Sequence, residues 1–152
     1  MFHRILVPLD GSIVAEAALA HAAAMADRFG AELILLRAVF LPQALALDLA
    51  NAQGALARES EAYLGEMARQ LTGPGRRIHT VVRWRPAAEA IIEYAIEQKV
   101  SVVVMATHGH TGLEQWPLGS IAEKVLRSMQ VPVLLVRPSQ GLSPPASHIQ
   151  KA

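Results

Sequence analysis

The sequence contains no cysteine among its 152 residues. Disulfide bonds and cysteine metal ligands are therefore excluded, and the composition fits a reducing compartment. No apolar run approaches the ~20 residues that a helix needs to cross a bilayer, and no charged segment precedes a signal-like apolar core. We therefore expect a cytoplasmic protein that has no membrane partner.

An excess of one charge is also missing, because 14 basic residues are balanced by 13 acidic residues spread along the chain. Without a basic run, nucleic acid is not an expected partner. The chain lacks a G-x-x-x-x-G-K-[ST] phosphate loop. It also lacks a Ser/His/Asp or Cys/His grouping whose spacing indicates covalent catalysis. The sequence therefore favours binding over catalysis.

Hydrophobic residues make up 52% of the chain and charged residues 18%, which at this length predicts one well-buried domain. Short apolar runs alternate with segments of helical periodicity. The expected strands are residues 4–9, 32–40, 77–84, 101–106 and 131–136, and the expected helices are residues 13–29, 44–71, 86–96 and 121–129. We expect residues 1–138 to form the domain and the Pro- and Ser-rich residues 139–152 to form a flexible tail.

Local signals predict several helix ends. Ser12 is expected to cap the helix that begins at Ile13, and Gly30 is expected in the left-handed conformation just past its C-terminus. Ser120 and Glu123 form an S-x-x-E pattern, which predicts Ser120 as the N-cap of the last helix.

The alternation of strands and helices predicts an α/β, Rossmann-like fold with a single five-stranded, mainly parallel sheet and helices on both faces. Ligands of such sheets bind beyond the carboxyl ends of the strands, where the winding direction reverses. If the strand order is 3-2-1-4-5, this crevice lies between the first and fourth strands. Residues 8–11 and 107–120 then form its walls.

The segment Val102 to Ser120 (VVVMATHGHTGLEQWPLGS) joins an expected buried strand to an expected helix N-terminus. The unpaired N–H groups and the dipole of a helix N-terminus both favour an anion, above all a phosphate. Gly112 alone is equally well explained as a turn glycine. His108 and His110 are two residues apart, which is a weak indication of a metal site, so we expect no metal ligands. We expect His108 to be solvated, whereas protonated His110 can donate to phosphate.

One motif in this segment resembles a known family signature. The run Met105-Ala106-Thr107-His108-Gly109, followed after nine residues by Gly119-Ser120, is similar to the nucleotide-binding pattern G-x-x-G-x9-G-S/T of the universal stress proteins. The opening ILVPLDGS, the Pro86-Ala87 helix start and the closing VPVLLV are similar to that family too. The resemblance covers residues 2 to about 137. It departs at Ala106, where the signature has its first glycine, and at Trp84, where a small residue is more usual.

The resemblance implies a homodimer that binds ATP in one branch of the family and no nucleotide in another. ATP is expected in the crevice, with Mg²⁺ or Mn²⁺ on its phosphates, and Asp10 is expected beside the ribose or adenine. The expected binding residues are Pro8, Leu9, Asp10, Ala38, Met105, Ala106, Gly109, His110, Thr111, Gly119, Ser120, Ile121 and Ala122.

Two other functions remain open. One is a stress-associated interaction protein of the same fold that binds no nucleotide, with Ala106 and Trp116 filling the cleft. The other is a slow ATP hydrolase, which ranks last because no residue is an evident base for orienting water. For the ATP-binding homodimer, we expect the interface at residues 131–136, because an apolar strand edge needs covering. A further protein partner is also open.

Overall fold

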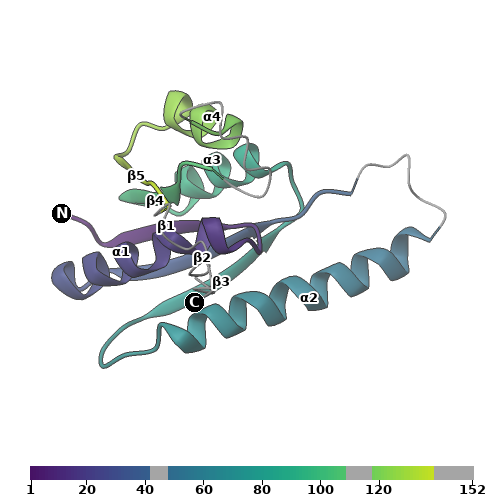
Figure 1. Ribbon diagram of the computed structural model, residues 1–152, viewed down its shortest axis with the longest axis horizontal. Helices are drawn as coiled ribbons and strands as arrows, with labels where there is room; N and C mark the ends of the chain where they lie inside the picture. Colours follow the sequence, from purple (N-terminus) through teal and green to yellow (C-terminus); the bar gives the residue numbers. More distant parts are fainter. Residues whose placement is uncertain (42–47, 109–117, 139–152) are drawn as a thin grey trace, which may run out of the picture.

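The structure is a computed structural model that describes residues 1–41, 48–108 and 118–138. Five parallel strands form one sheet in the order β3-β2-β1-β4-β5 (Figure 1), which confirms the predicted α/β topology. The strands are β1 (Arg4–Leu9), β2 (Glu32–Ala38), β3 (Ile78–Arg83), β4 (Val102–Ala106) and β5 (Val133–Val136). The helices are α1 (Ile13–Phe29), α2 (Leu49–Gln70), α3 (Ala87–Glu97) and α4 (Ser120–Ser128). The expected tail, residues 139–152, lies outside the described residues.

Helices cover both faces of the sheet, α1 and α2 on one face and α3 and α4 on the other (Figure 1). Successive strand residues point to opposite faces. Val7 accordingly packs in the core under α1 and α2, and Leu6 packs in the core under α3 and α4. This double burial explains why the strands read as continuous apolar runs rather than as alternating ones.

Helix α1 packs closely on the sheet because its buried face consists largely of alanines, including Ala18, Ala22 and Ala26. Both predicted caps are confirmed. Ser12 Oγ accepts a hydrogen bond from Ala15 N at 3.1 Å, and Gly30 adopts the left-handed conformation with φ of 62°.

Several predicted boundaries shift by one or two residues. β5 begins at Val133 rather than at Val131. Pro132 has no N–H group to donate to a ladder, so only its carbonyl joins the sheet, accepting from Val103 N at 3.0 Å. The start expected for the second helix falls within residues 42–47, outside the described residues, and α2 begins at Leu49.

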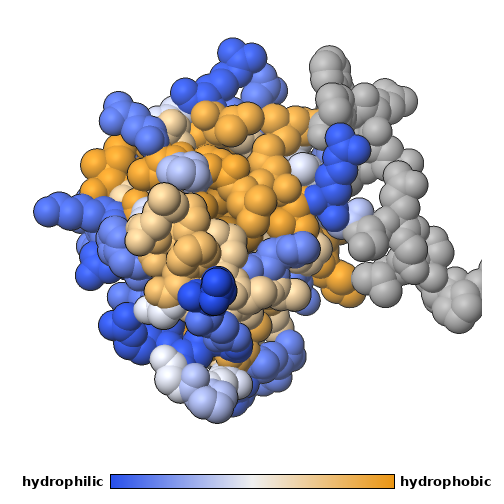
Figure 2. Space-filling view, turned by 90° about the vertical axis from the view of Figure 1, so that its left-hand side faces the viewer, coloured by the Kyte–Doolittle hydropathy of each residue, from blue (hydrophilic) through white to orange (hydrophobic). Residues whose placement is uncertain are grey.

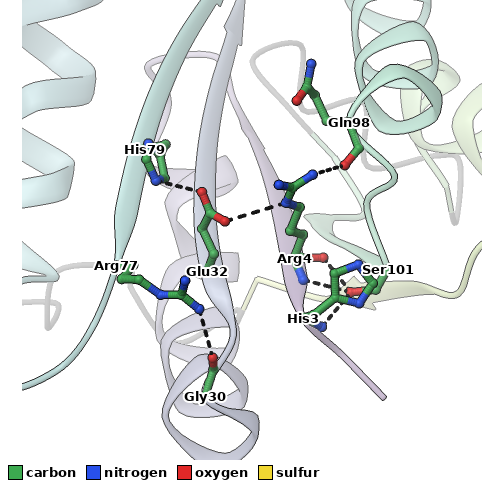
Figure 3. A network of polar contacts seen from close by, with 8 residues as sticks. All are labelled: His3, Arg4, Gly30, Glu32, Arg77, His79, Gln98 and Ser101. Carbon is green, nitrogen blue, oxygen red and sulfur yellow. Dashed lines mark hydrogen bonds and ion pairs between the residues drawn. The ribbon is translucent and has the colours of Figure 1, made fainter.

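A network of polar contacts ties the amino ends of four strands together (Figure 3). Ser101 Oγ accepts from the backbone N–H groups of His3 and Arg4 and donates to the Arg4 carbonyl. Glu32 lies between Arg4, at 3.5 Å, and His79, at 2.6 Å. These contacts fix the end of the sheet that lies opposite the carboxyl ends of the strands. In the three described ranges, no helix is long and apolar enough to cross a membrane.

Candidate functional site

A pocket of about 330 Å³ opens at the carboxyl ends of β1, β2 and β4. This is the point where the winding direction of the sheet reverses, because β1 pairs with both β2 and β4. The volume falls within the range of small-molecule sites. The lining residues are Pro8, Leu9, Asp10, Ala15, Leu36, Ala38, Ala87, Ile91, Met105, Ala106, Thr107, His108, Gly119, Ser120, Ile121 and Ala122.

The pocket brings together ten of the thirteen residues that the sequence predicts for a binding site. These ten are Pro8, Leu9, Asp10, Ala38, Met105, Ala106, Gly119, Ser120, Ile121 and Ala122. Gly109, His110 and Thr111, together with Gly112 and Trp116, fall within residues 109–117 and lie outside the described residues. Their predicted contribution to binding stays a prediction.

Thr107 and His108 belong to the segment 107–120 that is expected to wall the crevice, and both line the pocket. Four further lining residues are not predicted: Ala15, Leu36, Ala87 and Ile91. Leu36 could have been found from the two-residue period of a strand, because it shares a face with Ala38. Ala87 and Ile91 are four residues apart on α3 and so share a helix face. No local signal in the sequence indicates that this face of α3 reaches the pocket.

The N-terminus of α4 forms one wall of the pocket, and the predicted capping box is wrong there. Ser120 is the first helical residue rather than the N-cap, which is Gly119, and no side chain among the described residues caps the helix. The turn begins one residue early because Gly119 is anchored by a tertiary hydrogen bond. Its N–H donates to Thr107 O at 2.7 Å, while its carbonyl accepts from Glu123 N at 2.9 Å.

This early start leaves a row of backbone donors at the pocket wall. The N–H groups of Ser120, Ile121 and Ala122 have no hydrogen-bond acceptor among the described residues. All three residues line the pocket. Such unpaired N–H groups carry the positive end of the helix dipole, so the wall suits an anionic group.

The opposite wall contains a carboxylate with a structural role of its own. Asp10 Oδ1 accepts from Ser12 N at 2.9 Å and from Ser12 Oγ at 2.5 Å, which fixes the turn that leads into α1. His108, expected to be solvated, is partly buried, and its Nδ1 lies 3.1 Å from Thr107 Oγ1. Thr107, which accepts the hydrogen bond from Gly119 on the α4 side of the pocket, is buried, and its N–H donates to Val136 O, which ties that side to β5.

The rest of the lining is mainly apolar and comes from the face of the sheet under α3 and α4. Leu36, Met105 and Ile91 belong to the core on that side, and Ala38 packs against it. Ala106, which replaces the first glycine of the signature, is 6% exposed and lines the pocket. Trp84, the other departure, lines a separate hollow between α2 and β3 instead. In the described ranges, no three His, Asp or Glu side chains gather as metal ligands would.

Comparisons with known proteins agree with this geometry. Residues 1–137 match the model of the universal stress protein family. Universal stress protein MJ0531 of Methanocaldococcus jannaschii is 33% identical over 144 residues, which cover 90% of this chain and 83% of that protein. The solved structure of MJ0577 from the same organism is 27% identical with a TM-score of 0.83, covering 91% of this chain and 97% of that chain.

A second solved structure is of a universal stress protein in complex with cAMP. It is 26% identical with a TM-score of 0.70, covering 91% of this chain and 98% of that chain. The strand order, the pocket at the switch point and the match over 137 residues therefore agree, and the chain belongs to the universal stress protein family.

Proposed function

We propose that this protein is a regulatory protein that binds ATP in the crevice between β1 and β4. The observation that carries the proposal is the row of N–H groups at Ser120, Ile121 and Ala122, which have no acceptor in the part of the chain that the structure describes and which lie at a largely apolar pocket. A phosphate chain needs such donors, and a purine base needs an apolar slot beside them. The cAMP complex of a relative supports an adenine nucleotide as the ligand class.

The residues present suit the parts of an adenine nucleotide. The N–H groups at the start of α4 would donate hydrogen bonds to the phosphates, and the helix dipole would stabilise their negative charge. The base would lie against the small side chain of Ala38 and the apolar side chains of Leu36 and Met105, with Pro8 nearby. Asp10 would accept hydrogen bonds from ribose hydroxyls. Mg²⁺ or Mn²⁺ would be held through the phosphates, because these hard cations prefer oxygen ligands.

Regulation, rather than turnover, is the function that this site supports best. The titratable side chains in the described part of the pocket have structural contacts, since Asp10 Oδ1 accepts from Ser12 and His108 Nδ1 lies beside Thr107 Oγ1. Slow hydrolysis is the outcome that would revise this view. The other outcome is an interaction protein that binds no nucleotide. In that case Ala106 is the first residue to test, because its methyl group lies where the signature has a glycine.

The proposal includes a homodimer formed through β5. β5 pairs with β4 on one side, and within the described residues no strand pairs with its other side. Viewed from the side on which β5 lies in Figure 1, the surface carries a broad patch of apolar side chains (Figure 2). Leu134 of β5 and Leu126 of α4 are 39% and 45% exposed. An apolar strand edge of this kind favours pairing with a second copy.

The variant Ile121→Glu tests nucleotide binding most cleanly. Ile121 is 43% exposed and lies in the first turn of α4, where an acidic side chain is compatible with the helix dipole but repels a phosphate. Calorimetric titration with Mg-ATP should show saturable binding to the wild type, weakened on the order of 100-fold or more in the variant. Ile96→Glu serves as the matched control, since Ile96 is 70% exposed near the far end of α3. Absence of binding by the wild type, or equal binding by all three proteins, would overturn the proposal.

A further inference from the structure

Arg37 interrupts the apolar run of β2 directly beside the pocket. Its neighbours Leu36 and Ala38 line the pocket, so strand alternation directs Arg37 to the opposite face of the sheet, under α2. The side chain is only 14% exposed. A guanidinium carries its charge at every physiological pH, so its burial here calls for partners.

The partners of Arg37 come from helix α2 and from the turn between β1 and α1. The guanidinium carbon lies 5.1 Å from the centre of the Tyr63 ring on α2, a cation–π contact. Arg37 Nη2 lies 3.5 Å from Glu59 Oε1, also on α2. On its other side the guanidinium covers Gly11, where a Cβ would lie 3.4 Å from Nη2. Arg37 therefore fills the space between α2 and the turn that contains Asp10 and Gly11.

The Tyr63 side chain links this guanidinium to a group of three carboxylates: Glu59 contacts Arg37, Glu16 contacts the Tyr63 hydroxyl, and the charge of Asp10 acts on the same hydroxyl. The Tyr63 hydroxyl donates to Glu16 Oε1 at 2.9 Å. Burial raises the pKa of Tyr63, the hydrogen bond to Glu16 and the Glu16 charge raise it further, and Asp10 adds to the same effect, whereas the charge of Arg37 lowers it. The charges of Arg37 and Asp10 thus act on the same hydroxyl group. In the described ranges, Arg37 is the cation that contacts this group of side chains, through Glu59 and the Tyr63 ring.

This juxtaposition has a consequence for the pocket, because Asp10 lines it. Without a cation, the three carboxylates would create a negative field next to a site that suits an anion. The field would act over a distance of the order of the ~10 Å Debye length. Loss of the Arg37 side chain would also remove the group that packs against Gly11 in this turn.

We propose that Arg37 is a positioning residue of the nucleotide site, which holds the Asp10–Gly11 turn in place and offsets the surrounding carboxylate charge so that the pocket accepts a polyphosphate. The inference rests on the proposed function. It adds a residue that does not line the pocket and that selects for the charge of the ligand. Ligands with more phosphate groups should therefore depend more strongly on Arg37.

The test compares the affinities of AMP and ATP, measured by calorimetry at low ionic strength without divalent cations. Arg37→Ala should weaken ATP binding on the order of tenfold and AMP binding markedly less. Arg37→Lys, which retains the charge, should restore most of the ratio between the two affinities. Glu59→Gln removes one of the carboxylates, on a side chain that is 66% exposed. This variant should raise the affinity for ATP relative to the affinity for AMP. Added salt should reduce these differences.

Arg83→Ala is the matched control. Arg83 lies 5.0 Å from the Tyr94 ring and 2.9 Å from Glu97 Oε2, the same kinds of partner, but it does not line the pocket and does not contact the Asp10–Gly11 turn. The proposed role of Arg37 is wrong if Arg37→Ala weakens the binding of AMP and ATP by the same factor. It is also wrong if Arg37→Ala weakens ATP binding no more than Arg83→Ala does. In both cases the protein still binds nucleotide. If the wild type binds neither ligand, the proposed function fails and the role of Arg37 fails with it.

Discussion

The carbonyl oxygen of Thr107 lies so close to Gly119 that a Cβ built on residue 119 would be 2.9 Å from it. The same oxygen accepts the hydrogen bond from Gly119 N at 2.7 Å. The backbone at the start of α4 is therefore pressed against the end of β4. This signature glycine is therefore required for packing, whatever its role toward a ligand. A substitution at Gly119 would consequently confound loss of binding with loss of structure.

Gly119→Ala should lower the free energy of unfolding by about 1–3 kcal/mol, because the added methyl group forces the carbonyl of Thr107 aside. Urea denaturation measures this change. Gly65→Ala is the control, since no atom lies within 4 Å of a Cβ there and the site is inside α2. That control should gain up to about 1 kcal/mol from helix propensity. Equal effects of the two variants would show that position 119 has room for a side chain.

Ser60→Ala should stabilise the protein. Ser60 is fully buried in α2, and its hydroxyl has no hydrogen-bond partner among the described residues. Removing a buried, unpaired hydroxyl and gaining helix propensity should raise the free energy of unfolding by about 1 kcal/mol. Thermal and urea unfolding of the variant measure the difference. A loss of stability would mean that the hydroxyl has a partner in the folded protein.

The ion pair between Asp27 and Arg76 should make stability depend on pH. Arg76 Nε and Nη2 donate to the Asp27 carboxylate at 2.9 and 2.6 Å, and these hydrogen bonds hold the pKa of Asp27 below its ordinary value. Because the folded-state pKa is the lower one, the stabilisation is present above the unfolded-state pKa. It is lost as the pH falls through the folded-state pKa.

Asp27→Asn isolates this contribution, because the other lowered carboxylates, Glu66 and Glu89, are present in both proteins. Between about pH 5 and pH 2, the wild type should lose more free energy of unfolding than the variant does. Urea midpoints measured across this pH range give both curves. Parallel curves would show that Asp27 has the same pKa in the folded and unfolded chains.

Leu134→Lys should convert the proposed dimer to a monomer. Leu134 is an exposed apolar residue on the edge strand, and a lysine on a strand edge opposes pairing with another chain. Light scattering and sedimentation measure the mass of the 152-residue chain and of the variant. Ile96→Lys, at a more exposed position on α3, should leave the mass unchanged. A monomeric wild type would refute the dimer, and a dimeric Leu134→Lys variant would place its interface elsewhere.

The fold can be predicted from the sequence because the central strands β1 and β4 are apolar runs, β2 is one apart from Glu32 and Arg37, and the helices between the strands have apolar faces. Those signals are local, and because crossover connections are right-handed, few sheet topologies are possible for a chain of alternating strands and helices. The start of α4 was missed by one residue because the S-x-x-E pattern is local, whereas the hydrogen bond from Gly119 to Thr107 joins residues twelve positions apart.

The candidate site can be predicted only in part from the sequence. Residues at strand ends, such as Asp10 and Ala38, are implied by the topology itself. The contribution of α3 through Ala87 and Ile91 depends on how that helix lies over the sheet, which no local pattern specifies. Arg37 appears in the sequence as one charge in an apolar run. Its partners Glu59 and Tyr63 lie 22 and 26 positions later, and only the packing of α2 brings them to it.

The most direct measurement is a titration of the isotope-labelled protein with Mg-ATP, followed through its backbone amide NMR signals. Binding at the α4 N-terminus predicts saturable shifts for the amides of Ser120, Ile121 and Ala122 and for the Asp10–Gly11 turn. It predicts little change at Glu32 and Ser101, in the network at the opposite end of the sheet (Figure 3). Absence of saturable shifts, or shifts concentrated away from the crevice between β1 and β4, would contradict nucleotide binding at this site.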